Sequence, residues 1–520
     1  MKIYHRIAYQ YKYSFLLLII YLGTSFPFQD SLKSQVPAND LIFDEIVASI
    51  GSINITVEEF SNSYELGPAF VKRKTDSKSR YLKYMIYEKL LTLDGYSRNL
   101  DKEEEITSLI IDFKSDLATE EMFKEDILKN VEISKEEIDT VVTQKQLELD
   151  IRWLYVQNKE EKDGLLLDLN NGMSFDSLYQ LQFEDSIYLD DRSMKINRYQ
   201  LGKKNPELAE IIDTLPVGQV SIPIEADDGW YIFKIHNVWQ NIITTEAEMI
   251  RLRQESINSL KKKKMDKLSD DYVNKLLLQQ NPIIKIQSFN VLRAYLGLYN
   301  LTKEKYDEWN LSEKLSKALD ELNVTKENIG QTILIETNDG TILLEEFLVW
   351  YRNRSQYIKF NKTNVQSYSS SVESLVWRMV RDKLLAGQAY ERNYHTTESF
   401  TKQAEWWKDK IVYSVVKKDI VESVELKQEE VRFNSLESLE SLDVKSNEEK
   451  INTEITRRLF LKLNELKREY EININEDVLE KINVSEENNP RAIDFYTVKK
   501  GGLIPRTPYP TIDFEWINWE

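Results

Sequence analysis

Few residues of this chain have the types and spacing that enzymatic chemistry requires. The sequence contains no cysteine and only three histidines, His5, His236 and His395. Two histidines beyond the N-terminal segment are too few for a histidine-rich metal site or a proton relay. The sequence also lacks the Gly-x-Ser-x-Gly turn of a nucleophilic serine, a glycine-rich phosphate loop and the His-Glu-x-x-His pattern of a zinc helix. We therefore expect no metal and no cofactor.

Adjacent acidic residues are abundant, because the chain has 87 acidic side chains. Glu58 with Glu59 and Asp190 with Asp191 are two such pairs. Paired carboxylates can act as a general acid and a general base, but in so acidic a chain a solvated surface is their ordinary place. We expect both pairs, and His236 at the end of a strand, to be exposed.

The chain repeats one plan, a strand hairpin followed by helices. Ile46–Thr56 alternates apolar with small or polar residues around a turn at Gly51, and Thr56 with Glu59 has capping-box spacing. The stretch from Ile333 to Leu344 has the same pattern. Matched residues of the two copies are Glu58, Glu59, Phe60 and Tyr64 with Glu345, Glu346, Phe347 and Tyr351; Met85, Lys89, Tyr96, Arg98 and Asn99 with Met379, Lys383, Tyr390, Arg392 and Asn393; and Lys124, Asp126, Ile127 and Val131 with Lys417, Asp419, Ile420 and Val424.

Each copy is expected to end in a long charged helix and a short strand. The helices are predicted over Thr245–Gln280 and Glu448–Tyr470, and the strands over Ile283–Ile286 and Ile472–Ile474. The first copy carries an additional segment, residues 150–240, between its helices and its closing helix. The sequence therefore predicts a duplicated helical module with one inserted domain.

The inserted segment begins and ends with recognisable patterns. Ile151–Val156 is expected to form a strand, and Gly172, Phe175 and Leu178 mark the start of a helix. The final part turns at Gly218 and continues through Val220, Ser221 and Pro223. Asp228 and Gly229 then turn into a last strand that starts at Trp230 and Tyr231.

These patterns resemble the parvulin-type prolyl isomerases, in which two histidines face each other across a proline pocket. Trp153 and Tyr231 stand at the two histidine positions here. The family's pocket methionine and phenylalanine fall on Lys204 and Leu208, and its Gly-Gly segment on Asp190–Ser193. The resemblance therefore implies no catalytic residue, and we expect a weak or inactive isomerase. Candidate substrate-binding residues are Trp153, Phe175, Leu208, Trp230 and Tyr231.

The architecture around the insertion is similar to that of the SurA-like and PrsA-like foldases, in which a helical chaperone body carries parvulin domains. The fold class expected is α+β and predominantly helical. The expected domains are a signal peptide (1–25), the N-terminal part of a first chaperone module (26–149), a parvulin-like domain (150–240), the returning helix of the first module (241–290), a second module without an insert (291–485) and an extended tail rich in proline and aromatic residues (486–520).

The N-terminus indicates export. Lys2, Arg6 and Lys12 precede an apolar run from Phe15 to Leu22, and small residues follow up to Ser25, as in a signal peptide cleaved near Ser25. An uncleaved membrane anchor is the alternative. The formal net charge of −18 argues against binding to a phosphate backbone, so we expect no nucleic-acid partner.

Together these observations predict a periplasmic chaperone that holds unfolded polypeptides. The family resemblance implies that its clients are exported proteins, above all outer-membrane β-barrel precursors. Two alternatives stay open: an active prolyl isomerase, and an envelope adaptor that holds one folded partner. The tail from Asn488 to Glu520 either packs on its own domain or occupies a peptide-binding groove of the same chain.

Overall fold

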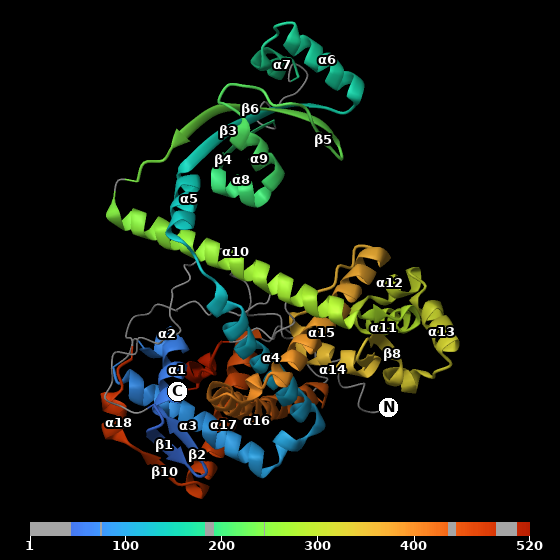
Figure 1. The fold of residues 1–520 in the computed structure, drawn as a ribbon. Coiled ribbons are helices and arrows are strands. Elements are labelled where there is room, and N and C mark those ends of the chain that lie inside the picture. Colours follow the sequence, from blue (N-terminus) through green and yellow to red (C-terminus); the bar gives the residue numbers. More distant parts are fainter. Residues whose placement is uncertain are drawn as a thin grey trace. The chain divides into compact units, whose positions relative to one another are not determined.

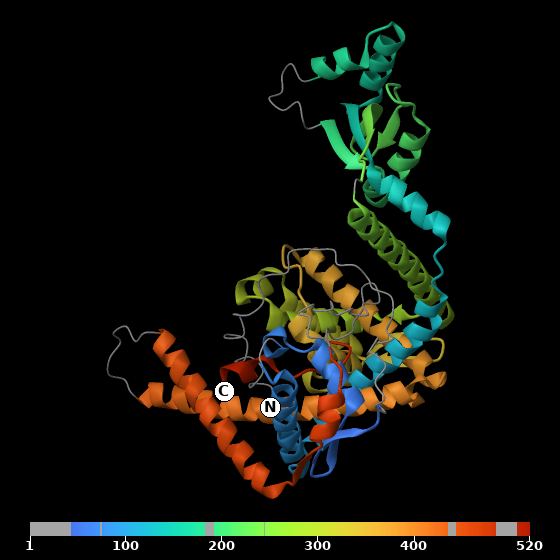
Figure 2. The same cartoon turned by 90° about the vertical axis from the view of Figure 1, so that its left-hand side faces the viewer.

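The computed structural model describes residues 43–72, 75–182, 192–243, 245–434, 444–484 and 507–519 (Figures 1 and 2). The predicted signal peptide, most of the tail, and Asp190 and Asp191 lie outside these residues. The described chain is predominantly helical with three small sheets, which confirms the predicted α+β class. Its contacts form two compact units: a body, made of the described residues up to Asn130 and from Asp266 onwards, and an inserted domain, Val131–Met265.

The body contains both predicted hairpins, each followed by a helix. Strands β1 (Ile46–Ile50) and β2 (Ile53–Thr56) precede α1 (Val57–Leu66), whose first turn is capped by a hydrogen bond from the Glu59 backbone N–H to Thr56 Oγ1, 3.2 Å long. Strands β8 (Ile333–Thr337) and β9 (Gly340–Leu343) precede α14 (Leu344–Arg354) in the same way. Gly51 takes a left-handed φ of +53° in the first turn, a conformation that favours glycine.

Each hairpin takes its third strand from the other copy. The strand β10 (Ile472–Ile474), which ends the second copy, pairs antiparallel with β1, whereas β7 (Ile283–Ile284), which ends the first, pairs antiparallel with β8. The sheet orders are β10-β1-β2 and β7-β8-β9. The sequence predicts that residues 241–290 return to the first module. In the structure the strand β7 in this range pairs with β8 of the second hairpin.

The long helices of the two copies pack in reciprocal pairs. Helices α3 and α4 of the first copy are equivalent to α15 and α16 of the second. Helix α3 packs against α16, and α15 packs against α4. The bounds of these four helices and of the other helices of the body are α2 (Ala69–Lys72), α3 (Ser77–Ser97), α4 (Glu104–Asp126), α10 (Glu246–Gln280, which begins in the inserted domain), α11 (Ile286–Asn300), α12 (Lys303–Glu308), α13 (Leu311–Leu322), α15 (Val365–Glu391), α16 (Glu398–Asn434), α17 (Val444–Glu469) and α18 (Glu476–Lys481).

Matched residues make matched ion pairs across the copies. Arg98 of α3's C-terminal end pairs with Asp419 (Nη2 to Oδ2, 2.5 Å), and the equivalent Arg392 pairs with Asp126, the residue equivalent to Asp419. The residues that follow the two arginines, Asn99 and Asn393, both have left-handed φ values, +56° and +61°. An interface in which residue i meets j and the equivalent j meets i is the signature of twofold symmetry, here within a single chain.

Other ion pairs between the copies are buried. Lys89 Nζ lies 2.7 Å from both Glu59 Oε1 and Asp409 Oδ2. Burial alone would lower the pKa of Lys89, but Asp409 and Glu59 raise it above its ordinary value. Our prediction that Glu58 and Glu59 are exposed was wrong, because Glu59 is buried beside Lys89 and Glu58 is half-buried.

The second buried pair holds α14 against α4. The guanidinium of Arg354 is 3 % exposed and contacts Asp112 and Asp116, with Nη2 3.1 Å from Asp116 Oδ1. Asp116 and Asp409 stand ten residues before Asp126 and Asp419, so they are equivalent positions. Each accepts a buried cation from the other copy.

The inserted domain is a four-stranded antiparallel sheet of order β4-β3-β6-β5 with helices on both faces. The hairpin predicted at Asp228 and Gly229 joins β5 to β6. The elements are α5 (Lys135–Gln146), β3 (Leu147–Val156), α6 (Lys159–Asn170), α7 (Phe175–Leu181), β4 (Ser193–Asn197), α8 (Arg198–Lys204), α9 (Pro206–Thr214), β5 (Ile224–Ala226) and β6 (Gly229–Gln240). Among the described residues, no helix is both long enough and apolar enough to cross a bilayer.

The buried arginine gives a test of how the copies are joined. Removing Arg354 leaves two carboxylates facing each other with their cation gone, so we expect Arg354→Ala to lower the free energy of unfolding of the body by about 3–5 kcal/mol. The exposed pair should matter little, and Arg98→Ala should cost at most about 1 kcal/mol. Urea unfolding followed by tryptophan fluorescence measures both. Equal losses from the two variants would contradict this account.

Candidate functional site

Four aromatic side chains lie side by side on one face of the inserted sheet. In the antiparallel pair β3 and β6, Trp153 stands opposite Phe233 and Tyr155 opposite Tyr231. Residues opposite each other on paired strands share a face, as do residues two apart on one strand. The ring centroids are 6.1 Å apart for Trp153 and Phe233, 5.1 Å for Tyr155 and Tyr231, and 6.0 Å for Tyr231 and Phe233. We call these four residues the aromatic row.

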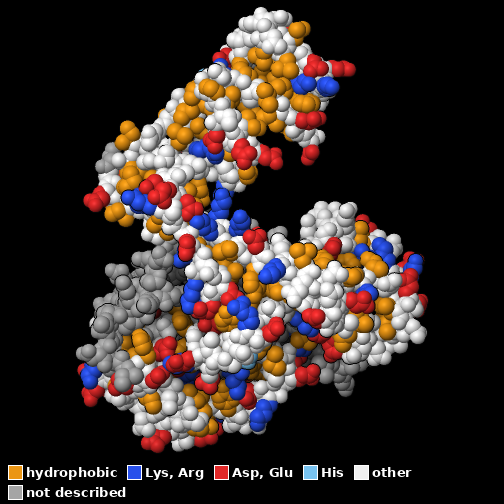
Figure 3. All heavy atoms as spheres, in the orientation of Figure 1, with side chains coloured by type: hydrophobic (Ala, Val, Ile, Leu, Met, Phe, Trp, Pro, Cys, Tyr) orange, Lys and Arg blue, Asp and Glu red, His pale blue; other side chains and the backbone are white. Residues whose placement is uncertain are grey.

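A packed core holds one end of the aromatic row. Helices α8 and α9 cover this face through Leu201 and Leu208, which pack with Leu149 and Ile151 of β3 in one buried cluster. Phe233 belongs to the same cluster, and Trp153 and Tyr231 pack against its edge while staying partly exposed. Hydrophobic side chains gather over this domain in the space-filling view (Figure 3). Phe233 is therefore held in the core, whereas Trp153 and Tyr231 are partly accessible to solvent.

The turn before β6 orients the two tyrosines. Tyr231 Oη donates a hydrogen bond to Asp228 Oδ2 (2.7 Å), and Tyr155 Oη donates to the Asp228 carbonyl oxygen (2.6 Å). A side chain at Gly229 would have its Cβ 2.4 Å from the Val156 carbonyl oxygen, so this close strand approach requires glycine. Burial and the Asp228 carboxylate raise the pKa of Tyr231 to about 12.

The Gly-x-Val-Ser segment fixes β6 from its other side. Ser221 Oγ accepts a hydrogen bond from the Phe233 backbone N–H (2.9 Å), and the Ser221 N–H donates to the Phe233 carbonyl oxygen (2.8 Å). Gly218, with φ +85°, donates its N–H to the Ile235 carbonyl oxygen. This motif therefore holds in register the strand that carries half of the aromatic row.

The five predicted substrate-binding residues divide between the two faces of the sheet. Trp153 and Tyr231 are in the aromatic row, and Leu208 lies in the core beneath that face. Phe175 is buried in the separate cluster on the other face. Trp230 precedes Tyr231 on β6 and so points away from it, with Lys162 Nζ 4.5 Å from its ring centroid. The structure thus brings three of the five together.

Sequence reasoning missed Tyr155 and Phe233. The signal was present, because Tyr155 lies two residues after Trp153 and Phe233 two residues after Tyr231 on strands that had been predicted. Arg192 adds a cation 5.6 Å from the centroid of the Tyr155 ring. His236 is exposed, and the described residues contain no group of acidic or histidine side chains that could hold a metal ion.

The chemistry available to the aromatic row is binding. Its side chains are four aromatic rings, two of which are phenols that donate to Asp228, and the guanidinium of Arg192 lies beside it. Aromatic faces of this kind bury proline rings, aromatic side chains or aliphatic side chains of an extended peptide, and an arginine at the edge can meet a backbone carbonyl or a carboxylate. The described part of the site offers no histidine to a bound peptide.

The chain is similar to a curated protein and to solved structures of foldases and chaperones. No family model matches the sequence. A curated relative, foldase protein PrsA of Oceanobacillus iheyensis, is 22% identical over 294 residues, which are 52% of this chain and 91% of the relative. Among solved structures, the peptidylprolyl isomerase PrsA of Bacillus cereus has 16% identity and a TM-score of 0.23, covering 54% of this chain and 99% of that chain.

A SurA-like chaperone structure from Campylobacter jejuni has 18% identity and a TM-score of 0.21, covering 45% of this chain and 96% of that chain. Both TM-scores are low, so neither likeness says anything about this fold as a whole. The resemblance noted in the sequence is supported by the curated relative, which aligns over nearly its entire length. Over about half of its length, this chain is related to the parvulin-type foldases and chaperones.

Proposed function

We propose that this protein is an exported chaperone that binds unfolded polypeptides, and that its parvulin-like domain binds them through the aromatic row without catalysing prolyl isomerisation. The observation that carries the proposal is the aromatic row itself. Four neighbouring rings occupy the face on which the family resemblance places two histidines. Trp153 and Tyr231 stand at those two positions.

The geometry favours binding over isomerisation for a physical reason. Rotation about a prolyl bond crosses a barrier of about 18–20 kcal/mol, and a catalyst must bind the twisted amide better than the planar one. That requires polar groups directed at a proline enclosed in a pocket. Here the tyrosine hydroxyls already donate to Asp228, and the row is a partly open surface.

The remaining features suit a chaperone of exported proteins. The N-terminal 25 residues have the pattern of a signal peptide, and an acidic surface with a net charge of −18 keeps a protein with exposed rings soluble. The printed name of the curated relative is foldase protein, and a structural neighbour is described as a SurA-like chaperone. As clients we propose outer-membrane β-barrel precursors, whose alternating apolar strands aggregate when unpaired.

The first test measures protection against aggregation. A urea-unfolded outer-membrane barrel protein is diluted into buffer with the chaperone, and light scattering is followed. We expect suppression near equimolar ratio. The variant Tyr155→Ala with Tyr231→Ala should need roughly tenfold more protein, because truncating an anchoring aromatic side chain commonly costs more than about 1 kcal/mol of binding. Tyr299→Ala is the matched control, since this exposed tyrosine lies in α11 of the body.

Unchanged protection by the double-tyrosine variant would refute the role of the aromatic row. No protection by the unaltered protein would refute the chaperone proposal and favour an adaptor of one folded partner.

A second test measures isomerisation on the same preparation. Cis-to-trans exchange of an Ala-Pro test peptide should proceed at its uncatalysed rate, with a time constant of about 10–100 s at 25 °C, even with equimolar protein. Acceleration that disappears in Tyr231→Ala would show instead that the domain is an active isomerase.

A further inference from the structure

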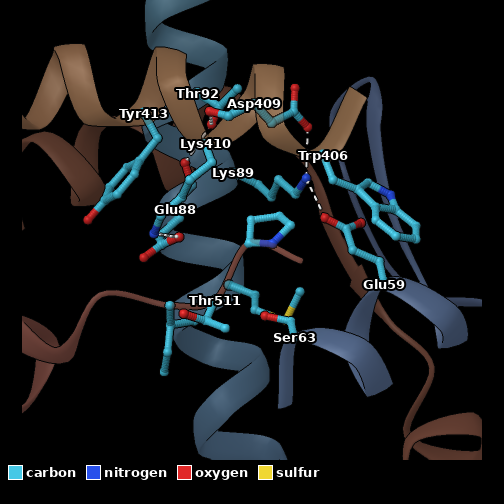
Figure 4. A pocket seen from close by; sticks show the side chains of 13 residues that line it. Glu59, Ser63, Glu88, Lys89, Thr92, Trp406, Asp409, Lys410, Tyr413 and Thr511 are labelled. Carbon is cyan, nitrogen blue, oxygen red and sulfur yellow. Dashed lines mark hydrogen bonds and ion pairs between the residues drawn. The ribbon is translucent and has the colours of Figure 1, made fainter. Parts of the chain in front are cut away.

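The C-terminal segment, residues 507–519, packs against α3 and α16 of the body. We call the surface that it covers the groove; it is formed by Tyr84, Tyr87 and Glu88 of α3 and Lys410, Tyr413 and Lys417 of α16. Phe514–Asn518 is a 3-10 turn, the other residues of the segment are neither helix nor strand, and no strand pairs with the segment. Figure 4 shows Thr511 close to Glu88 of α3, with Lys410 and Tyr413 of α16 alongside. The segment is therefore held chiefly by its side chains, as a bound peptide is.

The deepest contact is an indole. Trp516 is fully buried, stacks on Tyr84 with centroids 5.9 Å apart at 12°, and packs on Tyr87 at 5.6 Å. Its Nε1 donates a hydrogen bond to Glu88 Oε1 (3.0 Å). Trp519 adds a perpendicular ring contact at 5.1 Å. Two tyrosines and one carboxylate thus form a slot for an indole.

The second contact is a carboxylate. Asp513 accepts hydrogen bonds from Tyr413 Oη (2.8 Å) and Lys417 Nζ (2.6 Å), and Lys410 Nζ lies 2.9 Å away. Burial alone would raise the pKa of Asp513, but Lys410 and Lys417 hold it well below its ordinary value. The Asp513 backbone N–H donates to Glu88 Oε1 (2.8 Å), so Glu88 recognises the main chain and the indole together.

Much of the groove is built from contacts that do not involve the segment. Glu88 Oε2 lies 2.7 Å from Lys410 Nζ, and beneath it Lys89 is fixed by Glu59 and Asp409. Such a framework keeps the groups that recognise a ligand in position, which lowers the entropy cost of binding.

Comparison of the two copies shows how the indole slot arises. The position equivalent to Glu88 is Asp382, and it too accepts an indole hydrogen bond, from Trp350 Nε1 at 3.2 Å. Trp350 belongs to α14 of its own copy. The residue equivalent to Trp350 in the first copy is Ser63, which lines a small pocket together with Glu88 and Thr511. Because serine has no indole, Glu88 accepts its hydrogen bond from Trp516, which lies far away in the sequence.

Other residues of the groove also differ between the two copies. By the spacing of the matched blocks, Tyr84 and Tyr87 correspond to Arg378 and Arg381, and Tyr413 corresponds to Glu120. The aromatic walls are thus confined to the copy whose slot receives Trp516. The position of Lys417 keeps a lysine, Lys124, in the other copy.

We propose that this groove is a peptide-binding site for a segment carrying a carboxylate three residues before a tryptophan, with the tryptophan in a 3-10 turn that begins after the carboxylate, and that the C-terminal segment is an intramolecular ligand which other peptides of this chemistry displace. Only the further step, that such peptides belong to unfolded clients, rests on the function proposed above. The groove itself is tested with the chain's own peptide.

The experiment uses the full-length chain and a fluorescein-labelled peptide of residues 507–519. The variant Asp513→Ala with Trp516→Ala vacates the groove, and we expect fluorescence anisotropy to show saturable binding of the peptide, at least tenfold tighter than to the unaltered chain, where the linked segment competes. A peptide with the same two substitutions should not bind. Phe514→Ala is the matched control, because Phe514 is 53 % exposed, and should behave like the unaltered chain.

Absence of peptide binding to a folded double variant, or equal binding to both chains, would overturn the proposal. Circular dichroism reports whether the variant is folded. If it is not, limited proteolysis of the unaltered chain decides: excess peptide should speed cleavage within residues 507–519 several-fold, and an unchanged rate would mean that the segment is a fixed part of the body. If the protein suppresses aggregation but does not bind the peptide, the proposed role of the groove is refuted and the proposed chaperone function is not.

Discussion

The structure of the body depends on an exchange of strands between its two copies. A two-stranded hairpin is marginally stable by itself, and each hairpin here gains its third strand from the far end of the other copy. The helices that deliver these strands must therefore cross between copies. The cross-copy ion pairs follow, with Lys89 meeting Asp409 in one direction and Arg354 meeting Asp116 in the other. Neither copy has a complete sheet alone, so the duplicated body is one structural unit.

Duplication has also allowed the two halves to differ. One copy carries the inserted domain, and its α3 helix lines the groove that receives the C-terminal segment. The other copy has its own tryptophan at the equivalent acid and arginines in place of the groove's tyrosines. A symmetric framework thus supports two asymmetric surfaces rich in aromatic side chains, the aromatic row of the inserted domain and the groove of the body. We propose that both bind polypeptide segments.

The local elements were predictable from the sequence, whereas their partners were not. Thr56 and Glu59 mark the start of α1, and the Asp228–Gly229 turn marks the last hairpin, because capping and turn geometry are encoded within a few residues. The exchange of β7 and β10 was not predictable, since Ile283–Ile284 and Ile472–Ile474 are short apolar strands that suit either hairpin. The buried contact of Glu59 with Lys89, which also meets Asp409, likewise joins residues that are distant in sequence.

The candidate site shows the same division. Trp153 and Tyr231 lie on the paired strands β3 and β6, and strand parity would have added Tyr155 and Phe233. Parity would also have separated Trp230 from Tyr231. The position of Phe175 on the opposite face could not be read from sequence, because it depends on which side of the sheet α7 packs.

The central claim is that unfolded chains bind to the aromatic row, and site-specific crosslinking tests it most directly. A photoreactive phenylalanine analogue replaces Tyr155 in one variant and Tyr299 in another, and each is irradiated with an unfolded barrel precursor. The account predicts a strong crosslink from position 155 and a weak one from position 299. Equal crosslinking from the two positions, or none from position 155 while aggregation is still suppressed, would contradict it.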